Sequence, residues 1–88
     1  MRPRIDWMTR SDDRVLAFLA EKEIVASASV IAANIDYNPS YLSRRCRKLA
    51  AAGLLERIDK SNYRLTDLGE RYLSGDVDPE ALALDEES

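Results

Sequence analysis

The sequence of 88 residues predicts a mainly α-helical domain with a small β-hairpin, arranged as a winged helix-turn-helix. Four segments carry apolar residues at helical spacing. A short polar turn at residues 36–38 joins the second and third of these segments. After the third segment, the pattern becomes that of two short strands around a polar turn. This order of elements is typical of the fold.

The first two helices are predicted from their apolar faces and from their capping residues. Ser11 is the candidate N-cap of a helix at about 12–22, which has two acidic residues in its first turn. Residues 24–26 are interpreted as a short extended connector. Ser27 is then the candidate N-cap of a second, short helix, which ends near Ile35.

The third helix has clear signals at both ends. Asn38 followed by Pro39 is an N-cap with proline at the first helical position. Gly53 supplies the left-handed residue that commonly ends a helix. We therefore expect a helix at residues 39–52.

The remaining elements follow from turn and capping residues. Strands are expected at 55–58 and 62–65, around the polar turn "DKSN". Thr66 is the expected N-cap of a helix at 67–74. The predicted division of the chain is a winged helix-turn-helix domain at residues 1–75 and an acidic C-terminal tail at 76–88, the tail being a short helix or partly disordered.

The charges are distributed unevenly along the chain. The formal net charge is −3 and the sequence pI is about 4.9. Residues 44–71 nevertheless carry eight basic and four acidic residues, whereas residues 72–88 carry six acidic residues and no basic one. The overall pI therefore hides a basic centre. Such asymmetry indicates a nucleic-acid-binding face, although a solvated surface of mixed charge gives milder versions of it.

A helical wheel of the third helix separates its core side from its basic side. At about 100° per residue, Leu42, Cys46 and Leu49 form a buried stripe, with Arg45 and Ser43 at its two flanks. The exposed side is formed by Ser40, Tyr41, Arg44, Arg47 and Lys48. The alternative interpretation is that this side of the helix only faces solvent and binds no nucleic acid.

A recognition helix places base-reading side chains near its N-terminus and phosphate-binding cations along its length. Ser40, Tyr41 and Arg44 are placed for base edges, whereas Arg47, Lys48 and Arg45 suit phosphates. In the hairpin, Arg57 is interpreted as a partner of Glu56 or Glu70, and it is therefore not counted among the DNA-binding residues. The predicted DNA-binding residues are Ser40, Tyr41, Ser43, Arg44, Arg45, Arg47, Lys48, Lys60 and Arg64.

Composition argues against several other classes of protein. The chain has one cysteine and no histidine, so we expect no structural metal and no cofactor. It has no glycine-rich phosphate loop and no evident pair of catalytic carboxylates, so we do not expect an enzyme. The N-terminus has no apolar segment typical of a signal peptide, and no apolar run approaches the length of a membrane span. We expect a cytoplasmic protein with no membrane association.

Two motifs give the sequence a family resemblance. The stretches "AGLLER" and "YRLTDLG" follow the predicted recognition helix and enclose the predicted wing. Over roughly residues 6–75 the chain resembles haloarchaeal winged-helix regulators of the phage phi-H repressor type, and more distantly the MarR and PadR-like groups. An excess of acidic residues, with ten arginines against three lysines, is also similar to proteins of halophilic archaea.

The resemblance implies a transcriptional regulator, often a repressor, that acts as a homodimer on double-stranded DNA. The candidate dimer residues are apolar residues without another assigned role: Ile5, Trp7, Met8, Tyr72, Leu82 and Leu84. Trp7 and Met8 are also candidates for packing onto the core of their own chain. Two alternatives to DNA binding stay open. One is a protein–protein interaction module of the transcription machinery, and the other is redox sensing by Cys46.

Overall fold

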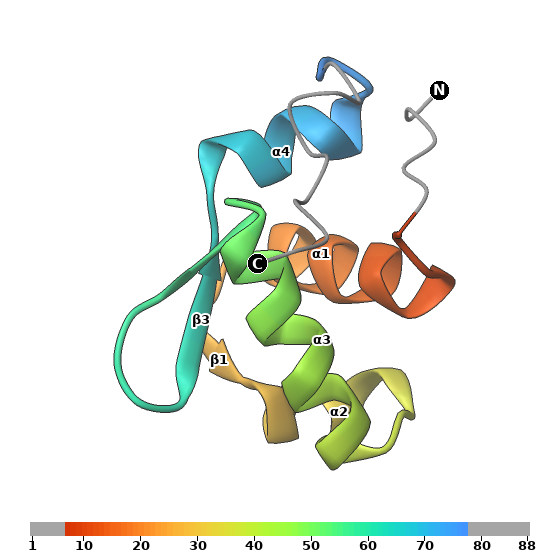
Figure 1. The fold of residues 1–88 in the computed structure, drawn as a ribbon, viewed down its shortest axis with the longest axis vertical. Coiled ribbons are helices and arrows are strands. Elements are labelled where there is room, and N and C mark those ends of the chain that lie inside the picture. Colours follow the sequence, from red (N-terminus) through yellow and green to blue (C-terminus); the bar gives the residue numbers. More distant parts are fainter. Residues whose placement is uncertain (1–6, 78–88) are drawn as a thin grey trace.

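The computed structural model describes residues 7–77, and Figure 1 shows the arrangement of their helices and strands. The elements within these residues are α1 (Arg10–Lys22), β1 (Ala26–Ser27), α2 (Ala28–Ile35), α3 (Pro39–Ala51), β2 (Leu55–Arg57), β3 (Asn62–Leu65) and α4 (Asp67–Ser74). They form the predicted winged helix-turn-helix. The predicted acidic tail at 76–88 lies almost wholly outside the described residues, and the division at residue 75 stays a prediction.

The N-cap of α1 differs from the prediction. Thr9, not Ser11, is the capping residue: its side chain accepts a hydrogen bond from the backbone N–H of Asp12. The Asp12 carboxylate in turn accepts from the backbone N–H of Thr9 at 3.0 Å. This reciprocal capping box begins the helix earlier than predicted and leaves Ser11 inside the first turn. The hydroxyl of Ser11 is therefore free for a tertiary contact.

The caps of the other helices are confirmed. Ser27, Asn38 and Thr66 each accept a hydrogen bond from a backbone N–H in the first turn of α2, α3 and α4, respectively. Gly53 has a φ of +86° directly after α3, so it supplies the expected left-handed residue. Helix α3 ends at Ala51, one residue before the predicted end, because Ala52 forms its C-cap.

The sheet contains one strand more than the predicted hairpin. Strand β3 lies in the centre, with β2 on one side and β1 on the other, and both pairings are antiparallel. The segment predicted as an extended connector becomes β1, in which Ala26 pairs with Tyr63 of β3. The connector is thus hydrogen-bonded to the wing. Two residues of strand are too few to recognise from sequence alone.

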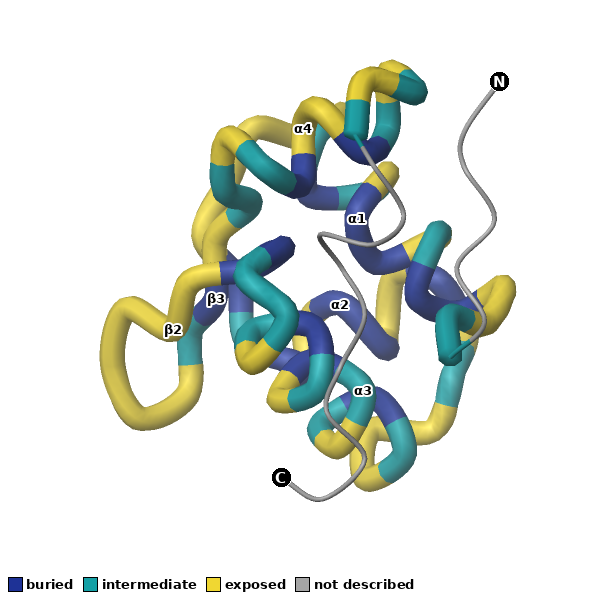
Figure 2. Tube along the Cα trace, turned by 45° about the horizontal axis from the view of Figure 1, so that its top comes forward, coloured by how far each residue is buried: buried dark blue, intermediate teal, exposed yellow. Residues whose placement is uncertain are grey.

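One hydrophobic core joins the helices to the sheet (Figure 2). Leu16 of α1, Ile31 of α2, and Leu42 and Leu49 of α3 are all 0% exposed. Burying each such side chain contributes about 1.5–3 kcal/mol relative to leaving it in water. Since α3 is held by its apolar stripe, its opposite side must face solvent.

Three of the six predicted dimer residues lie within residues 7–77, and all three belong to this core or pack against it. Tyr72 is only 3% exposed, and its hydroxyl donates to the Asp13 carboxylate at 2.5 Å, so its assignment to a dimer surface is wrong. Trp7 and Met8 are partly buried and pack on the core, which was the other interpretation of these two residues. The candidates Ile5, Leu82 and Leu84 lie outside the described residues.

Candidate nucleic-acid interface

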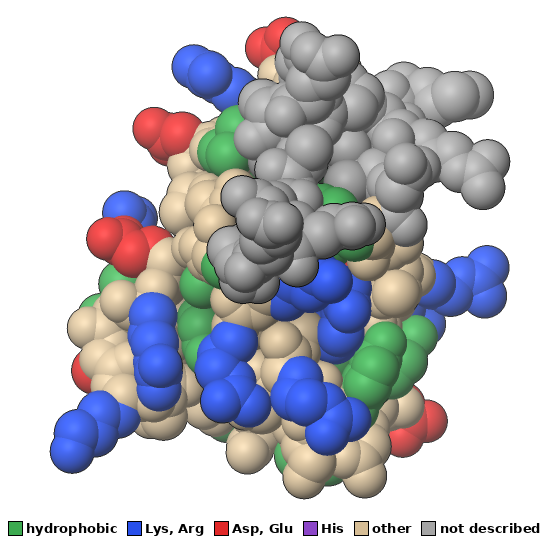
Figure 3. Space-filling model, in the orientation of Figure 1, with side chains coloured by type: hydrophobic (Ala, Val, Ile, Leu, Met, Phe, Trp, Pro, Cys, Tyr) green, Lys and Arg blue, Asp and Glu red, His purple; other side chains and the backbone are tan. Residues whose placement is uncertain are grey.

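The apolar stripe of α3 sets the direction of its basic side. Leu42, Cys46 and Leu49 are fully buried, as the helical wheel predicts. Arg44 and Arg47 are exposed, and neither has an ion-pair partner or a hydrogen-bond partner among residues 7–77. In Figure 3, Lys and Arg side chains extend from the hairpin across α3 on one face of the molecule. Two arginines of α3 are thus free to bind an anionic partner.

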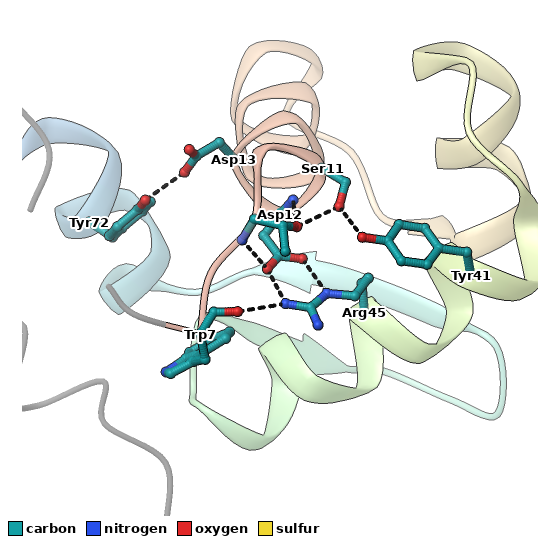
Figure 4. A network of polar contacts seen from close by, with 8 residues as sticks. Trp7, Ser11, Asp12, Asp13, Tyr41, Arg45 and Tyr72 are labelled. Carbon is teal, nitrogen blue, oxygen red and sulfur yellow. Dashed lines mark hydrogen bonds and ion pairs between the residues drawn. The ribbon is translucent and has the colours of Figure 1, made fainter. Parts of the chain in front are cut away.

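Arg45 has a different environment from its neighbours, although it was predicted to bind phosphate. Its Nε donates to the Asp12 carboxylate at 2.9 Å, and its Nη2 donates to the Trp7 carbonyl oxygen at 3.0 Å (Figure 4). Asp12 is 0% exposed and the Arg45 side chain is 16% exposed. Hydrogen bonding to Asp12 raises the pKa of the Arg45 guanidinium. This geometry favours a structural role, because the guanidinium is engaged by α1 and by the segment before it.

Tyr41 is also turned toward α1 rather than fully outward. Its hydroxyl lies 2.9 Å from the Ser11 hydroxyl, which in turn lies 2.7 Å from the Thr9 hydroxyl. Its ring stacks on Tyr37 at a centroid distance of 6.3 Å. Hydrogen bonding to Ser11 is the largest cause of the lowered pKa of the Tyr41 phenol. The predicted base-reading role of Tyr41 is therefore not the one that its contacts favour.

Lys48 lies between these two situations. Its Nζ is 5.5 Å from the centroid of the Trp7 ring, within the range of a cation–π interaction, and the residue is half-buried. Together with the hydrogen bond from Arg45 to Trp7, this contact ties α3 to the segment before α1. The predicted phosphate role of Lys48 stays a prediction.

The two predicted serines lie on different parts of α3. Ser40 is exposed in the first turn, where its backbone N–H donates to the Asn38 side chain at 2.9 Å. Ser43 is half-buried on the side of α3 that faces the hairpin, and it lines a cleft shared with Arg47 and Lys60. The fold thus brings three of the predicted residues together at this cleft.

The hairpin pairs its charges differently from the prediction. Arg64, predicted to contact DNA, forms an ion pair with Glu56. Both side chains are about half exposed, at 53% and 52%, so this surface pair is weak and exchangeable. Arg57 pairs with neither Glu56 nor Glu70. It donates instead to the carbonyl oxygens of Asp59 and Lys60, and so braces the tip of the wing. The register of the two strands explains why Arg64, and not Arg57, pairs with Glu56, since Glu56 lies opposite Arg64.

Asp59 organises the turn at the wing tip. Its carboxylate accepts hydrogen bonds from the backbone N–H groups of Ser61 and Asn62, at 2.9 and 3.0 Å. The hydrogen bond from Ser61 is the largest cause of the lowered pKa of this carboxyl group. Sequence reasoning assigned no role to Asp59, although an aspartate that begins a polar turn is a usable signal. Lys60 is left exposed beside it.

Cys46 has no feature of a reactive thiol. It is fully buried, and desolvation is the largest cause that raises its pKa to about 12. A thiol with such a pKa stays protonated at neutral pH, and the thiolate is the reactive form. The geometry therefore supports the interpretation of Cys46 as a small core residue. Among residues 7–77, no group of His, Cys, Asp or Glu side chains is placed to hold a metal ion, and no helix is long and apolar enough to span a membrane.

The geometry of a recognition helix beside a wing agrees with comparisons to known proteins. The model of the winged helix-turn-helix phage repressor family matches residues 1–85. The chain belongs to this family. It is 40% identical, over 81 residues, to the repressor protein of Halobacterium phage phiH, covering 88% of this chain and 91% of the relative.

A solved structure agrees with the family assignment. The chain resembles the crystal structure of the PhiH1 repressor-like protein from Haloarcula marismortui with a TM-score of 0.82 and 36% identity, covering 90% and 91% of the two chains. Family and relatives identify a DNA-binding repressor, and the relatives come from a phage of Halobacterium and from Haloarcula marismortui, which fits the halophilic composition.

Proposed function

We propose that this repressor inserts α3 into the major groove of double-stranded DNA and places the hairpin of β2 and β3 along the adjacent backbone. The observation that supports this proposal is the state of Arg44 and Arg47. Both are exposed on the outer side of a helix whose other side is locked in the core. Unpaired arginines so fixed in direction suit a polyanion, because their charges are not neutralised by carboxylates among residues 7–77.

The two arginines have different expected tasks. Arg44 lies nearer the N-terminus of α3, where recognition helices contact base edges, and a guanidinium can bind O6 and N7 of guanine in a bidentate manner. Arg47 lies one turn later, toward the wing, and suits a phosphate. Ser40 is exposed at the start of α3 and completes the proposed reading edge. Arg45 and Tyr41 act as supports of the helix rather than as DNA ligands.

The test is binding of duplex DNA by the Arg44→Ala/Arg47→Ala double variant. Fragments selected from genomic DNA by the wild-type protein serve as the probe, and affinity is measured by fluorescence anisotropy at several salt concentrations. Loss of one bidentate base contact should cost about 1–3 kcal/mol of discrimination between bases. Loss of phosphate contacts should lower the slope of log affinity against log salt by about 0.9 for each contact.

Arg71→Ala is the matched control, because it removes an exposed arginine from α4, away from α3. It should keep DNA affinity nearly unchanged. Both variants should unfold at nearly the wild-type temperature, since exposed substitutions usually change stability by less than about 0.5 kcal/mol. Wild-type affinity in the double variant would overturn the placement of α3.

We further propose that the repressor acts as a homodimer, in the cytoplasm and without enzymatic activity. The family resemblance supports dimerisation, but Tyr72 is buried and does not contribute to a dimer surface. Sedimentation of the protein with and without its operator tests the oligomeric state. A protein-interaction module instead of a repressor would bind no duplex at any salt concentration, and no observation favours this alternative.

A further inference from the structure

The basic face contains a cleft between α3 and the wing. Its volume is about 180 Å³. Its serine and basic lining residues come from four parts of the chain, with Ser27 from β1, Ser29 from α2, Ser43 and Arg47 from α3, and Arg57, Lys60 and Ser61 from the hairpin. The packing of α3 against both α2 and the sheet therefore creates the cleft.

The lining has an unusual charge for this chain. It includes three cationic side chains and four serines, and none of its residues is acidic, although the whole chain has sixteen acidic residues. The two acidic residues of the hairpin are engaged elsewhere. Asp59 turns its carboxylate into the hairpin turn, and Glu56 pairs with Arg64. The cleft thus offers hydrogen-bond donors and positive charge without a carboxylate of its own.

The wing side of the cleft is held in place by Arg57. Its Nε donates to the Asp59 carbonyl oxygen at 3.2 Å, and its Nη2 donates to the Lys60 carbonyl oxygen. A guanidinium has five N–H donors, so others remain for a ligand. Lys60, by contrast, has no ion-pair or hydrogen-bond partner for its ammonium among residues 7–77, and neither does Arg47 for its guanidinium.

We propose that this cleft binds a single backbone phosphate of the duplex, shared by Arg47 of α3 and Lys60 of the wing. The inference rests on the proposed function and adds to it a defined site. A phosphate oxygen accepts hydrogen bonds from guanidinium, ammonium and hydroxyl groups, all of which line the cleft. Sharing one phosphate couples the wing to α3 and sets the angle at which α3 enters the groove.

The experiment is a double-mutant cycle on duplex affinity with Arg47→Ala, Lys60→Ala and the double variant. If both side chains bind the same phosphate, the DNA affinity of the double variant should lie within about twofold of the affinity of the single variant that binds DNA more weakly. The salt slope of the double variant should fall by about 0.9, the value for one phosphate. The thermal midpoint of each variant, followed by circular dichroism, checks that the fold is kept.

A parallel cycle with Arg44→Ala and Lys60→Ala is the matched control. Arg44 has the same charge on the same helix but does not line the cleft, so its effect should add to that of Lys60. Additive losses in the Arg47 cycle, with a slope change of about 1.8, would assign two separate phosphates and overturn the proposal. Unchanged affinity in either single variant would overturn it as well.

The proposed function can fail independently of this inference. If the wild-type protein binds no duplex, the repressor proposal fails before any variant is compared. Titration with inorganic phosphate, followed by the amide NMR signals of Ser43 and Ser61, then decides about the cleft. Selective shifts without duplex binding would assign the cleft to a free phosphate and overturn its role in DNA binding.

Discussion

Helix α3 carries two pairs of basic residues with the same spacing and opposite environments. Arg44 and Arg47 point outward and have no partner among residues 7–77. Arg45 and Lys48 both contact Trp7, and Arg45 also forms an ion pair with the buried Asp12. A step of one residue rotates a side chain by about 100°, which moves it from the solvent side to the side of α1. Four neighbouring cations thus separate into two without a partner among residues 7–77 and two that contact the segment before α1.

Substitution by Met should therefore have different effects in the two pairs, lowering stability at Arg45 and DNA affinity at Arg44. Arg45→Met removes a guanidinium but keeps an apolar side chain, and it leaves the Asp12 carboxylate buried without its ion-pair partner. The expected cost is about 3 kcal/mol of unfolding free energy, toward the lower end for broken buried pairs because Arg45 is partly exposed. Urea unfolding in a buffer of fixed salt concentration measures this loss.

Arg44→Met is the matched control on the adjacent residue. It should change the unfolding free energy by less than about 0.5 kcal/mol while weakening DNA binding. Arg45→Met, measured at a temperature where it is folded, should keep most of its DNA affinity. Equal destabilisation by the two substitutions would contradict the division of α3 into an attached side and an open side.

Burial of Cys46 on the apolar side of α3 should make the stability of the protein decrease at alkaline pH. Cys46 has a pKa of about 12 in the folded chain, whereas an unfolded cysteine titrates near ~8.5. The unfolded state thus loses its proton first as the pH rises. The contribution of Cys46 is complete below about pH 8.5 and is lost as pH approaches 12, at up to about 1.4 kcal/mol per pH unit.

Comparison with Cys46→Ala isolates this effect, because the variant shares every other titrating group. The stability advantage of the wild type should shrink between pH 8 and pH 10 in urea unfolding. A difference independent of pH would show that the thiol titrates alike in both states, and would place Cys46 in a less buried environment than the structure gives it.

The smallest expected effect concerns Tyr41, which sequence reasoning placed on the reading edge. Tyr41→Phe removes the hydrogen bond to Ser11 but keeps the ring that stacks on Tyr37. It should cost about 1 kcal/mol of unfolding free energy and leave DNA affinity nearly unchanged. Anisotropy titration and thermal unfolding of the same sample measure both quantities. A large loss of affinity at unchanged stability would return Tyr41 to the DNA-binding residues.

Local signals predicted most of the fold. The caps at Ser27, Asn38 and Thr66 and the left-handed Gly53 act within a few residues of the chain, so they are readable without tertiary structure. The stripe of α3 follows from helical periodicity in the same way. The prediction was wrong at the start of α1, where Thr9 and Asp12 form a capping box, because serine is by itself a stronger N-cap than threonine and Ser11 was therefore preferred.

Three side chains near the candidate site have contacts that the sequence did not indicate. Arg45, Tyr41 and Arg57 were assigned by charge, by wheel position or by proximity in sequence. The partners of Arg45 and Tyr41 lie 33 and 30 residues away in the sequence, whereas Arg57 donates to carbonyl oxygens two and three residues away in the hairpin turn. A helical wheel gives the direction of a side chain but not the element of the fold that packs against it. The contacts of Arg45 and Tyr41 depend on how α1 docks against α3, and those of Arg57 depend on the conformation of the hairpin turn.

The amino-acid sequence alone accounts for the apolar and the basic side of α3, because helical periodicity is a property of the chain. It also determined the basic centre in an acidic chain, and the motifs that indicate the repressor family. Which cations remain free depends instead on tertiary packing, since neutralisation of Arg45 requires Asp12 to be buried at the same place. Tertiary packing also brings Ser43, Arg47 and Lys60 to one cleft, because α3 and the hairpin must pack together before their side chains share a space.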